Sequence, residues 1–331
     1  MSTLLTRDEQ SASVAHTSGR RVGVDLARTL GLTAVVVGHL AVYDEVRALT
    51  FSWHVPLFFV LAGYLWKPSR RALPVEVASR SARALVPYLV WLPVGGAAMW
   101  WVRRALGRPL PLTDVVERSL WGGLSLVGPA APFWFLTAFA VAVGVVALTW
   151  RMSPAVSVLV GLGGTAAVAL HPGWSTWPLA VAPALVGVLL VVAGRGLRSI
   201  APRVSRPVRV GVALVLSGLL LAGSGVSAPL DLRALDLGTP VLSLVVAVAI
   251  CAGLVLVCEG AAHRLPGGVA PVVTTFAEIA VPVFLLHLAV ADVLALEVRD
   301  VDRIWMAPFA VAVAVAVGLA ARASSWRRFL L

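Results

Sequence analysis

The sequence predicts an all-α, polytopic membrane protein, a bundle of about ten transmembrane helices. Hydrophobic residues make up 59% of the 331 positions and charged residues only 13%, against about 25% charged residues in an ordinary soluble domain. Ten apolar stretches are long enough to span, or nearly span, a bilayer. The formal net charge of +11 lies mostly between these stretches, as expected when cytoplasmic loops retain Lys and Arg. This pattern excludes a soluble enzyme and a disordered chain, and it favours membrane loops over nucleic-acid binding as the reason for the charge.

The predicted spans follow one another with short connections. They cover residues 22–43, 48–66, 84–102, 133–150, 154–171, 175–193, 208–223, 239–258, 270–296 and 305–321. The fifth and sixth spans are the least clearly separated, because Pro172 to Pro178 leaves room only for a brief turn. Cys251 and Cys258 lie within one span and are interpreted as packing residues, since their spacing along one helix excludes a disulfide.

The distribution of basic residues predicts that both ends of the chain are cytoplasmic. Most of the 27 Lys and Arg residues fall in segments that are inside in this N-in/C-in arrangement. The exception is the external loop 103–132, which holds several arginines. Residues 1–21 carry acidic residues and no small-residue cleavage site, so they are expected to be a polar cytoplasmic tail. Residues 22–321 then form the transmembrane domain, and residues 322–331 a basic cytoplasmic tail.

Three polar side chains in the first span share one face. Asp25, Arg28 and His39 fall within a stripe about 60° wide if the span is helical. Arg28 and His39 are separated by about 16 Å of helix rise along that stripe. Because a charged residue in a span costs about 2.5–3.5 kcal/mol on insertion scales, the stripe indicates a cavity wall. The alternative is that Asp25 and Arg28 only pair with each other and cap the helix.

Further polar residues are expected to join this stripe. His54 in the second span lies at a depth similar to that of His39, and the nearby Pro56 removes a backbone hydrogen bond there. Glu278 near mid-membrane and His287 toward the outside belong to the ninth span. The alternatives are structural: interhelical hydrogen bonds for the histidines and an arginine partner for Glu278. No Cys, His and carboxylate cluster has metal-ligand spacing, so no metal is expected.

The sequence also resembles the acyltransferase-3 family of integral membrane O-acyltransferases, which includes enzymes that acetylate fucose and other cell-surface sugars. The resemblance is dense over residues 22–91 and sparse afterward. Its matching segments are Val24–Arg28, Val35–His39, His54–Tyr64, Arg80–Trp91, Phe133–Leu136 and Glu278–His287. The stretch His54–Phe59 is the most specific of them, and Ala62 stands where the family usually has Ser.

The resemblance implies a reaction and roles for these residues. The expected enzyme is a multi-pass O-acetyltransferase of the bacterial plasma membrane that moves an acyl group, commonly acetyl, from cytoplasmic acyl-CoA to a hydroxyl of a sugar, glycan or natural product. The donor would be acyl-CoA, with no metal and no nucleic-acid partner. The implied catalytic residues are His39, Asp25 and His54; the donor-binding residues are Arg28, Arg80 and Arg83; and Glu278 and His287 are supporting residues.

Several alternatives remain open at this level. His39 could act as general base or carry the acyl group itself. Arg80 and Arg83 could be ordinary positive-inside anchors. A transporter or flippase could use the polar stripe as a substrate path, although no internal repeat of the kind found in many transporters is visible. A non-enzymatic membrane protein would use the histidines only for structure.

Overall fold

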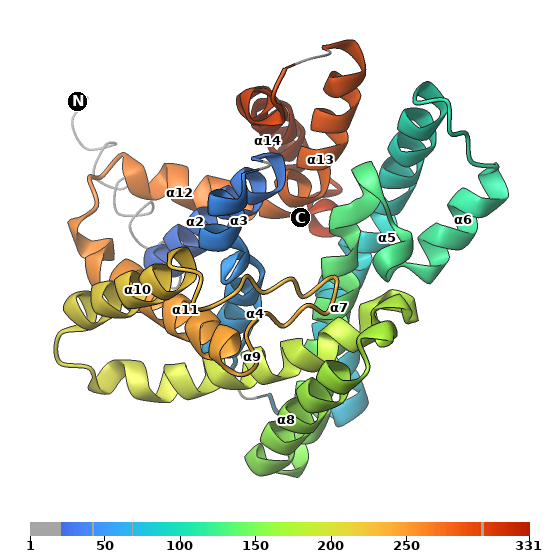
Figure 1. Cartoon of the computed structure of the whole chain (residues 1–331). Coiled ribbons are helices and arrows are strands. Elements are labelled where there is room, and N and C mark those ends of the chain that lie inside the picture. Colours follow the sequence, from blue (N-terminus) through green and yellow to red (C-terminus); the bar gives the residue numbers. More distant parts are fainter. Residues whose placement is uncertain (1–20, 42, 68, 299–300) are drawn as a thin grey trace, which may run out of the picture.

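The computed structural model describes residues 21–41, 43–67, 69–298 and 301–331, and this part of the chain is almost entirely helical (Figure 1). Its α-helices are α2 (Val22–Leu40), α3 (Asp44–Phe51), α4 (His54–Tyr64), α5 (Leu73–Ala105), α6 (Leu112–Trp121), α7 (Trp134–Met152), α8 (Pro154–Leu170), α9 (Val181–Ile200), α10 (Pro207–Gly223), α11 (Leu242–Ala261), α12 (Val269–Glu278), α13 (Ala280–Glu297), α14 (Ala307–Ala323) and α15 (Arg327–Leu330). Within these residues the sole β-type pairing is an isolated bridge between Asp231 and Asp236. The predicted all-α class is therefore confirmed. The predicted N-terminal tail, apart from Arg21, lies outside the described residues.

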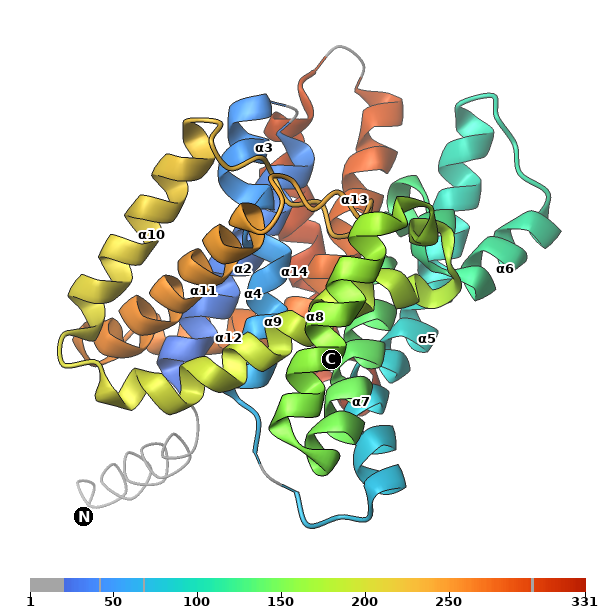
Figure 2. The ribbon, with the colours of Figure 1, turned by 60° about the horizontal axis from the view of Figure 1, so that its bottom comes forward.

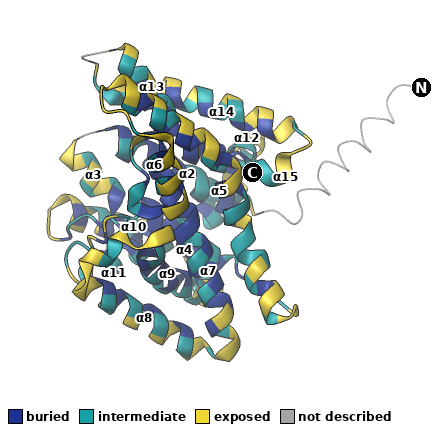
Figure 3. Ribbon diagram, turned by 90° about the vertical axis from the view of Figure 1, so that its right-hand side faces the viewer, coloured by how far each residue is buried: buried dark blue, intermediate teal, exposed yellow. Residues whose placement is uncertain are grey.

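Eight described helical segments are long and apolar enough to cross a membrane, which makes the chain a polytopic membrane protein. Helices α8 and α10 match the fifth and seventh predicted spans but are shorter than these eight. Large apolar side chains on the outer surface, such as Leu159, Leu216 and Leu220, are more than half exposed. Figure 3 shows this exposure along the outside of α8, while the inner helices are buried. A lipid-facing surface accounts for these exposed apolar side chains, because exposing so large an apolar area to water would be unfavourable.

Two predicted spans are broken, each four residues before a proline. The stretch 270–296 is two helices, α12 and α13, rather than the single predicted helix, because Pro282 has no N–H to donate to the carbonyl of Glu278. The stretch 48–66 likewise divides into α3 and α4, and Pro56 lies four residues after Ser52 at that break. From Pro56 only the loss of a backbone hydrogen bond within one span was predicted, and the structure instead has two helices there. The break at Glu278 was not predicted either.

Helix α2 lies in the interior of the bundle. It packs against α3, α4, α11, α12 and α13, so side chains on different sides of α2 meet different neighbours. Figure 2 shows α2 beside α4 and α11. Its residues Ala27, Leu32, Val35 and Leu40 are almost completely buried. A central helix of this kind can position a polar stripe within the protein rather than toward lipid.

Helices α4 and α9 approach each other so closely that only glycine fits at their crossing. A Cβ atom added to Gly63 would lie 1.9 Å from the carbonyl oxygen of Val191. A Cβ added to Gly194 would lie 2.0 Å from the carbonyl oxygen of Val60. The close approach is what small residues allow at helix crossings in membranes. It fixes α4, and with it His54, against the rest of the bundle.

We therefore expect Gly63→Ala to destabilise the protein by at least the ~1–3 kcal/mol typical of overpacking, because backbone rather than a flexible side chain must move. The measurement is thermal unfolding of the detergent-solubilised protein, followed by size-exclusion chromatography. Gly196→Ala on α9 is the matched control, since a Cβ there meets nothing within 4 Å and alanine favours the helix. Equal melting temperatures for the two variants would contradict the close packing.

One irregular segment crosses the end of the bundle. Residues 224–241 connect α10 to α11, and within them Asp231 and Asp236 exchange backbone hydrogen bonds of 2.9 and 3.0 Å. The side chain of Arg233 reaches the carbonyl oxygen of Leu126, 2.5 Å away, in the segment before α7. We call residues 231–236 the polar turn; it brings a charged segment over the ends of α2 and α4.

Candidate active site

Three histidines from three helices meet beneath the polar turn. His39 lies in the last turn of α2, His54 is the first residue of α4, and His287 lies within α13. The rings of His39 and His287 are stacked with their centroids 5.3 Å apart. The ring of His54 is edge-on to His39 at 5.6 Å. Sequence reasoning predicted that these residues converge, and the structure brings all three together as the histidine cluster.

The hydrogen bonds of the cluster determine where its protons lie. Nδ1 of His287 is 2.7 Å from the carbonyl oxygen of Phe284, which can only accept, so Nδ1 donates. In a neutral His287 ring, Nε2 is then an acceptor, and Nδ1 of His39, 3.0 Å away, donates to it. By the same rule, Nε2 of a neutral His39 carries a lone pair. We call these hydrogen bonds, from His39 through His287 to Phe284, the hydrogen-bond relay. It leaves His39 with a basic nitrogen and occupies both nitrogens of His287.

His54 is held in a different way. Its Nδ1 donates to the carbonyl oxygen of Thr50, 2.7 Å away, so Nε2 of a neutral His54 is an acceptor. In this tautomer His54 is able to accept a hydrogen bond from a hydroxyl group but not to donate one to an oxyanion. A substrate-holding role is thus better suited to His54 than to His287, whose nitrogens are both occupied.

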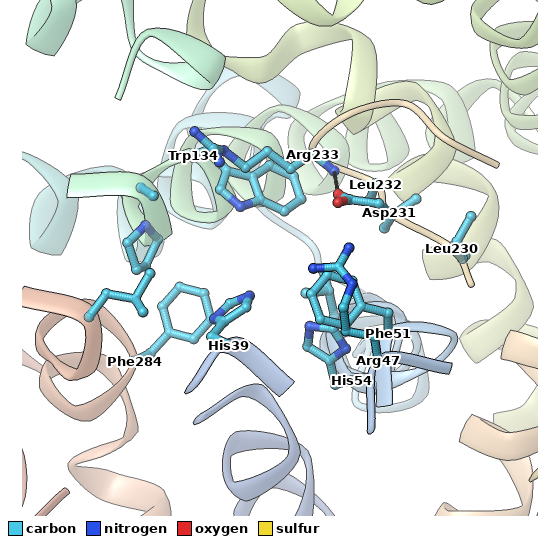
Figure 4. Close-up of a pocket in the computed structure, with 14 residues that line it drawn as sticks. His39, Arg47, Phe51, His54, Trp134, Leu230, Asp231, Leu232, Arg233 and Phe284 are labelled. Carbon is cyan, nitrogen blue, oxygen red and sulfur yellow. Dashed lines mark hydrogen bonds between the residues drawn. The ribbon is translucent and has the colours of Figure 1, made fainter. Parts of the chain in front are cut away.

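A cavity of about 180 Å³ adjoins the cluster, and we call it the histidine cavity. Apolar and aromatic side chains form much of its wall, including Phe51, Trp134 and Phe284. Figure 4 shows His39 and Phe284 on one side of it and His54 with Phe51 on the other. It is smaller than the ~300–1,000 Å³ usual for drug-sized ligands. The volume suits one small ring or a short chain next to His39.

Charged residues that sequence reasoning missed complete the wall of the histidine cavity. They are Arg47 of α3 and, from the polar turn, Asp231 and Arg233. Burial lowers the pKa of the Arg233 guanidinium. One signal was available in the sequence: both arginines lie in segments predicted to be external, where basic residues are less common. Nothing in the sequence, however, places the polar turn above α2.

At the other end of α2, Asp25 and Arg28 form an ion pair. Arg28 Nη1 is 3.3 Å from Asp25 Oδ1, and Asp25 is buried. His39 is fourteen residues further along the same helix, about 21 Å of rise away. Asp25 therefore lies too far along α2 to contact the histidine cluster, and its pairing with Arg28 agrees with the prediction that it orients that residue.

A second cavity, of about 830 Å³, opens at that same end of the bundle. We call it the arginine pocket, and its basic lining residues are Lys67, Arg70, Arg71, Arg80 and Arg83. Arg80 is held in place by two hydrogen bonds to Glu76 Oε1, of 3.0 and 2.8 Å, and by stacking 3.7 Å above the centroid of the Trp66 ring system. Positively charged guanidinium groups gathered around an open cavity are suited to phosphate groups.

A third cavity, of about 290 Å³, lies between the other two. Arg83 lines both this middle cavity and the arginine pocket, and Phe284 lines both the middle cavity and the histidine cavity. Phe284 packs with Phe135, ring centroids 5.1 Å apart, and with Phe58, 6.4 Å apart. The three cavities thus form a series from the arginine pocket to His39, with these three phenylalanines at the inner junction.

Glu278 lines the middle cavity together with Arg28. It ends α12, at the unpredicted helix break, and its Oε2 is 2.7 Å from Nε of Arg322 near the end of α14. The structural alternative for Glu278, an arginine partner, thus describes one of its contacts. Among the residues that the structure describes, no three His, Cys, Asp or Glu side chains form a group able to hold a metal ion.

Comparison with known proteins agrees with this architecture. The fold and the site define the class of protein: an all-helical, polytopic membrane bundle with a buried histidine cluster and arginine-lined cavities. The acyltransferase-3 family model, described as an acyltransferase domain, matches residues 21–323, and the chain belongs to this family. The nodulation protein NolL of Mesorhizobium japonicum is 25% identical over 137 residues. That similarity covers 38% of this chain and 34% of NolL, about a third of the relative's length. No solved structure matches the chain.

Proposed function

We propose that the protein is a membrane O-acyltransferase that moves an acetyl group from acetyl-CoA to a hydroxyl group of a carbohydrate or small-molecule acceptor. The observation that carries this proposal is the hydrogen-bond relay, which leaves the lone pair of His39 Nε2 beside a cavity of about 180 Å³. Membership of the acyltransferase-3 family supports the reaction class. The acetyl group, the CoA donor and the acceptor are parts of the proposal.

The proposed orientation places the arginine pocket at the cytoplasm and the histidine cavity toward the outside of a bacterial plasma membrane. This N-in/C-in arrangement is supported by the many basic residues at the end of the bundle where Arg21, Lys67, Arg151 and Arg322 lie. Acyl-CoA is made and kept in the cytoplasm, so the donor has to arrive on that side.

The donor path follows the three cavities. The phosphate groups of CoA bind in the arginine pocket, where Arg80 and Arg83 supply charge-assisted hydrogen bonds. The pantetheine arm lies in the middle cavity past Arg28, and the thioester reaches the histidine cavity beside Phe284. Long, flexible and mostly uncharged, the arm suits a passage whose wall includes Leu32, Phe58 and Phe135.

The chemical step transfers one acyl group and one proton. The acceptor hydroxyl gives its proton to His39 Nε2 while its oxygen attacks the thioester carbonyl. The carbon–sulfur bond then breaks, and the CoA thiolate recovers the proton from His39, so the products are an ester and free CoA. His287 orients His39, and His54 Nε2 accepts a hydrogen bond from the acceptor. If His39 carried the acyl group instead, the kinetics would be ping-pong.

The direct test uses the purified protein in detergent with radiolabelled acetyl-CoA and a panel of hydroxylated acceptors. Label in an ester product, together with stoichiometric release of free CoA, is the expected result. Movement of an acceptor across liposomes without acetyl-CoA would instead indicate the transporter alternative. Absence of both CoA release and acetyl-CoA binding would refute the proposal.

A variant of the arginine pocket tests the donor path. We expect Arg83→Gln to raise the KM for acetyl-CoA by about tenfold or more, because a charge-assisted hydrogen bond contributes ~1.5–3 kcal/mol. The comparison is with Arg209→Gln on α10, whose exposed side chain lies outside the arginine pocket. Initial rates at varied acetyl-CoA give both values. An unchanged KM in Arg83→Gln would return this residue to the role of a positive-inside anchor.

A further inference from the structure

Two guanidinium groups at the histidine cavity have no carboxylate within ion-pair distance among the residues that the structure describes. Six ion pairs join residues that the structure describes, and neither Arg47 nor Arg233 takes part in any of them. Arg303, which lines an adjoining cavity with Arg47, is by contrast neutralised by Asp292 at 2.6 Å. Two guanidinium groups without an ion-pair partner among the described residues therefore lie at the cavity that holds His39.

Each of these arginines is held in place by the protein. The guanidinium carbon of Arg47 lies 4.2 Å above the centroid of the Phe51 ring, and that ring in turn packs against His54 at 4.8 Å. Arg233 Nη2 donates to Leu126, and its Nε is buried with no hydrogen-bond partner among the described residues. Because a buried donor without a partner is costly, the site is suited to a ligand that supplies an acceptor.

Asp231 does not cancel this charge. It is the only acidic residue in the wall of the histidine cavity as described. Its Oδ1 accepts hydrogen bonds from the backbone N–H groups of Arg233 and Ala234, both at 3.1 Å, and so shapes the polar turn. The wall of the histidine cavity thus contains one carboxylate and two arginines. With neutral histidines, its net charge is positive.

From this arrangement we infer that the acceptor carries an oxyanion, a carboxylate or a phosphate, close to the hydroxyl that is acylated, and that Arg47 and Arg233 bind it. The inference rests on the proposed function, since it describes the second substrate of that reaction. Arginine is suited to this role because its planar fork binds carboxylate and phosphate oxygens through two parallel hydrogen bonds. With the oxyanion at the rim, the adjacent ring would lie in the cavity with a hydroxyl toward His39 Nε2.

The test compares methyl hexosides that differ only at carbon six. This carbon carries a hydroxymethyl group in the neutral glycoside, and it is a carboxylate or a phosphorylated hydroxymethyl group in the two charged ones. All three are made in the gluco, galacto and manno series. Equilibrium binding to the full-length protein in detergent is measured without acetyl-CoA, and acetyl transfer is measured separately. We expect a charged glycoside to bind at least about tenfold more tightly than its neutral counterpart, as one charge-assisted hydrogen bond provides. Arg47→Gln and Arg233→Gln should each reduce this ratio about tenfold, while Arg47→Lys keeps part of it.

Arg108→Gln is the matched control, because Arg108 is exposed and lies outside the histidine cavity. Arg47 is also exposed, so we expect the fold to tolerate its replacement even if Arg233→Gln disturbs the polar turn. The inference would be overturned if charged and neutral glycosides bound equally well. It would also be overturned if the arginine variants lost the same factor of affinity for the charged as for the neutral glycosides. Stronger competition by phosphatidylglycerol than by the charged glycosides would overturn it as well, because the ligand would then be a lipid headgroup. Charge-dependent binding without any acetyl transfer would count against the proposed function instead.

Discussion

Replacing His39 with alanine is expected to reduce acetyl transfer by about 10²–10⁴-fold, the usual contribution of a positioned general base. The reason is local: in the hydrogen-bond relay, His39 Nε2 is the nitrogen that keeps a lone pair at the histidine cavity. The side chain is also far from the arginine pocket, so binding of acetyl-CoA should change little. The measurements are single-turnover transfer of labelled acetyl groups and equilibrium binding of the donor.

His263→Ala is the matched control for this variant. His263 lies in the short segment after α11, outside all three cavities of the donor path. It should transfer acetyl groups at the wild-type rate. Normal transfer by His39→Ala would remove His39 from the mechanism, whatever the result for the control.

The second large effect is expected at His287, which contacts no substrate in the proposed mechanism. His287→Phe removes the acceptor for His39 Nδ1–H, so the proton of His39 is no longer confined to that nitrogen. We expect kcat to fall by about 10²-fold or more, as for other residues that fix a catalytic tautomer, with little change in the KM for acetyl-CoA. His287→Gln should recover part of the rate, because its side-chain oxygen is able to accept the same hydrogen bond.

A double variant separates positioning from packing. If His287 acts only through His39, the pair His39→Ala and His287→Phe should be no slower than His39→Ala alone. Additive losses, or a His287→Gln variant as slow as His287→Phe, would mean that His287 contributes by filling space. Thermal unfolding of each variant is recorded beside the kinetics, because His287 is fully buried.

Much of the fold was accessible from the sequence because lipid imposes a simple pattern. Long apolar stretches had to be helices, and the shared face of Asp25, Arg28 and His39 followed from helix periodicity alone. The convergence of His39 with His54 followed from the antiparallel order of neighbouring spans. The helix break at Glu278 was missed, although Pro282 carried the information. A proline inside a predicted span is equally compatible with an unbroken helix that is only kinked.

The remaining parts of the site depend on contacts between distant segments, which periodicity does not report. Arg233 is about two hundred residues from His39 in the chain, and only the path of residues 224–241 across the bundle brings them together. The series of cavities is likewise a property of packing, since Arg83 and Phe284 belong to different helices. The individual roles of His39, Asp25, His54, Arg28, Arg80, Arg83, Glu278 and His287 stay predictions.

The junction formed by Phe58, Phe135 and Phe284 has a consequence for the living cell. An enzyme that works between a cytoplasmic donor and an external acceptor spans a membrane that stores energy as ion gradients. In the proposed mechanism the acyl group and the arm that carries it pass along these aromatic rings. The proposed mechanism would therefore deliver metabolic carbon to the outside through an apolar, aromatic passage, which disfavours the entry of hydrated protons or sodium.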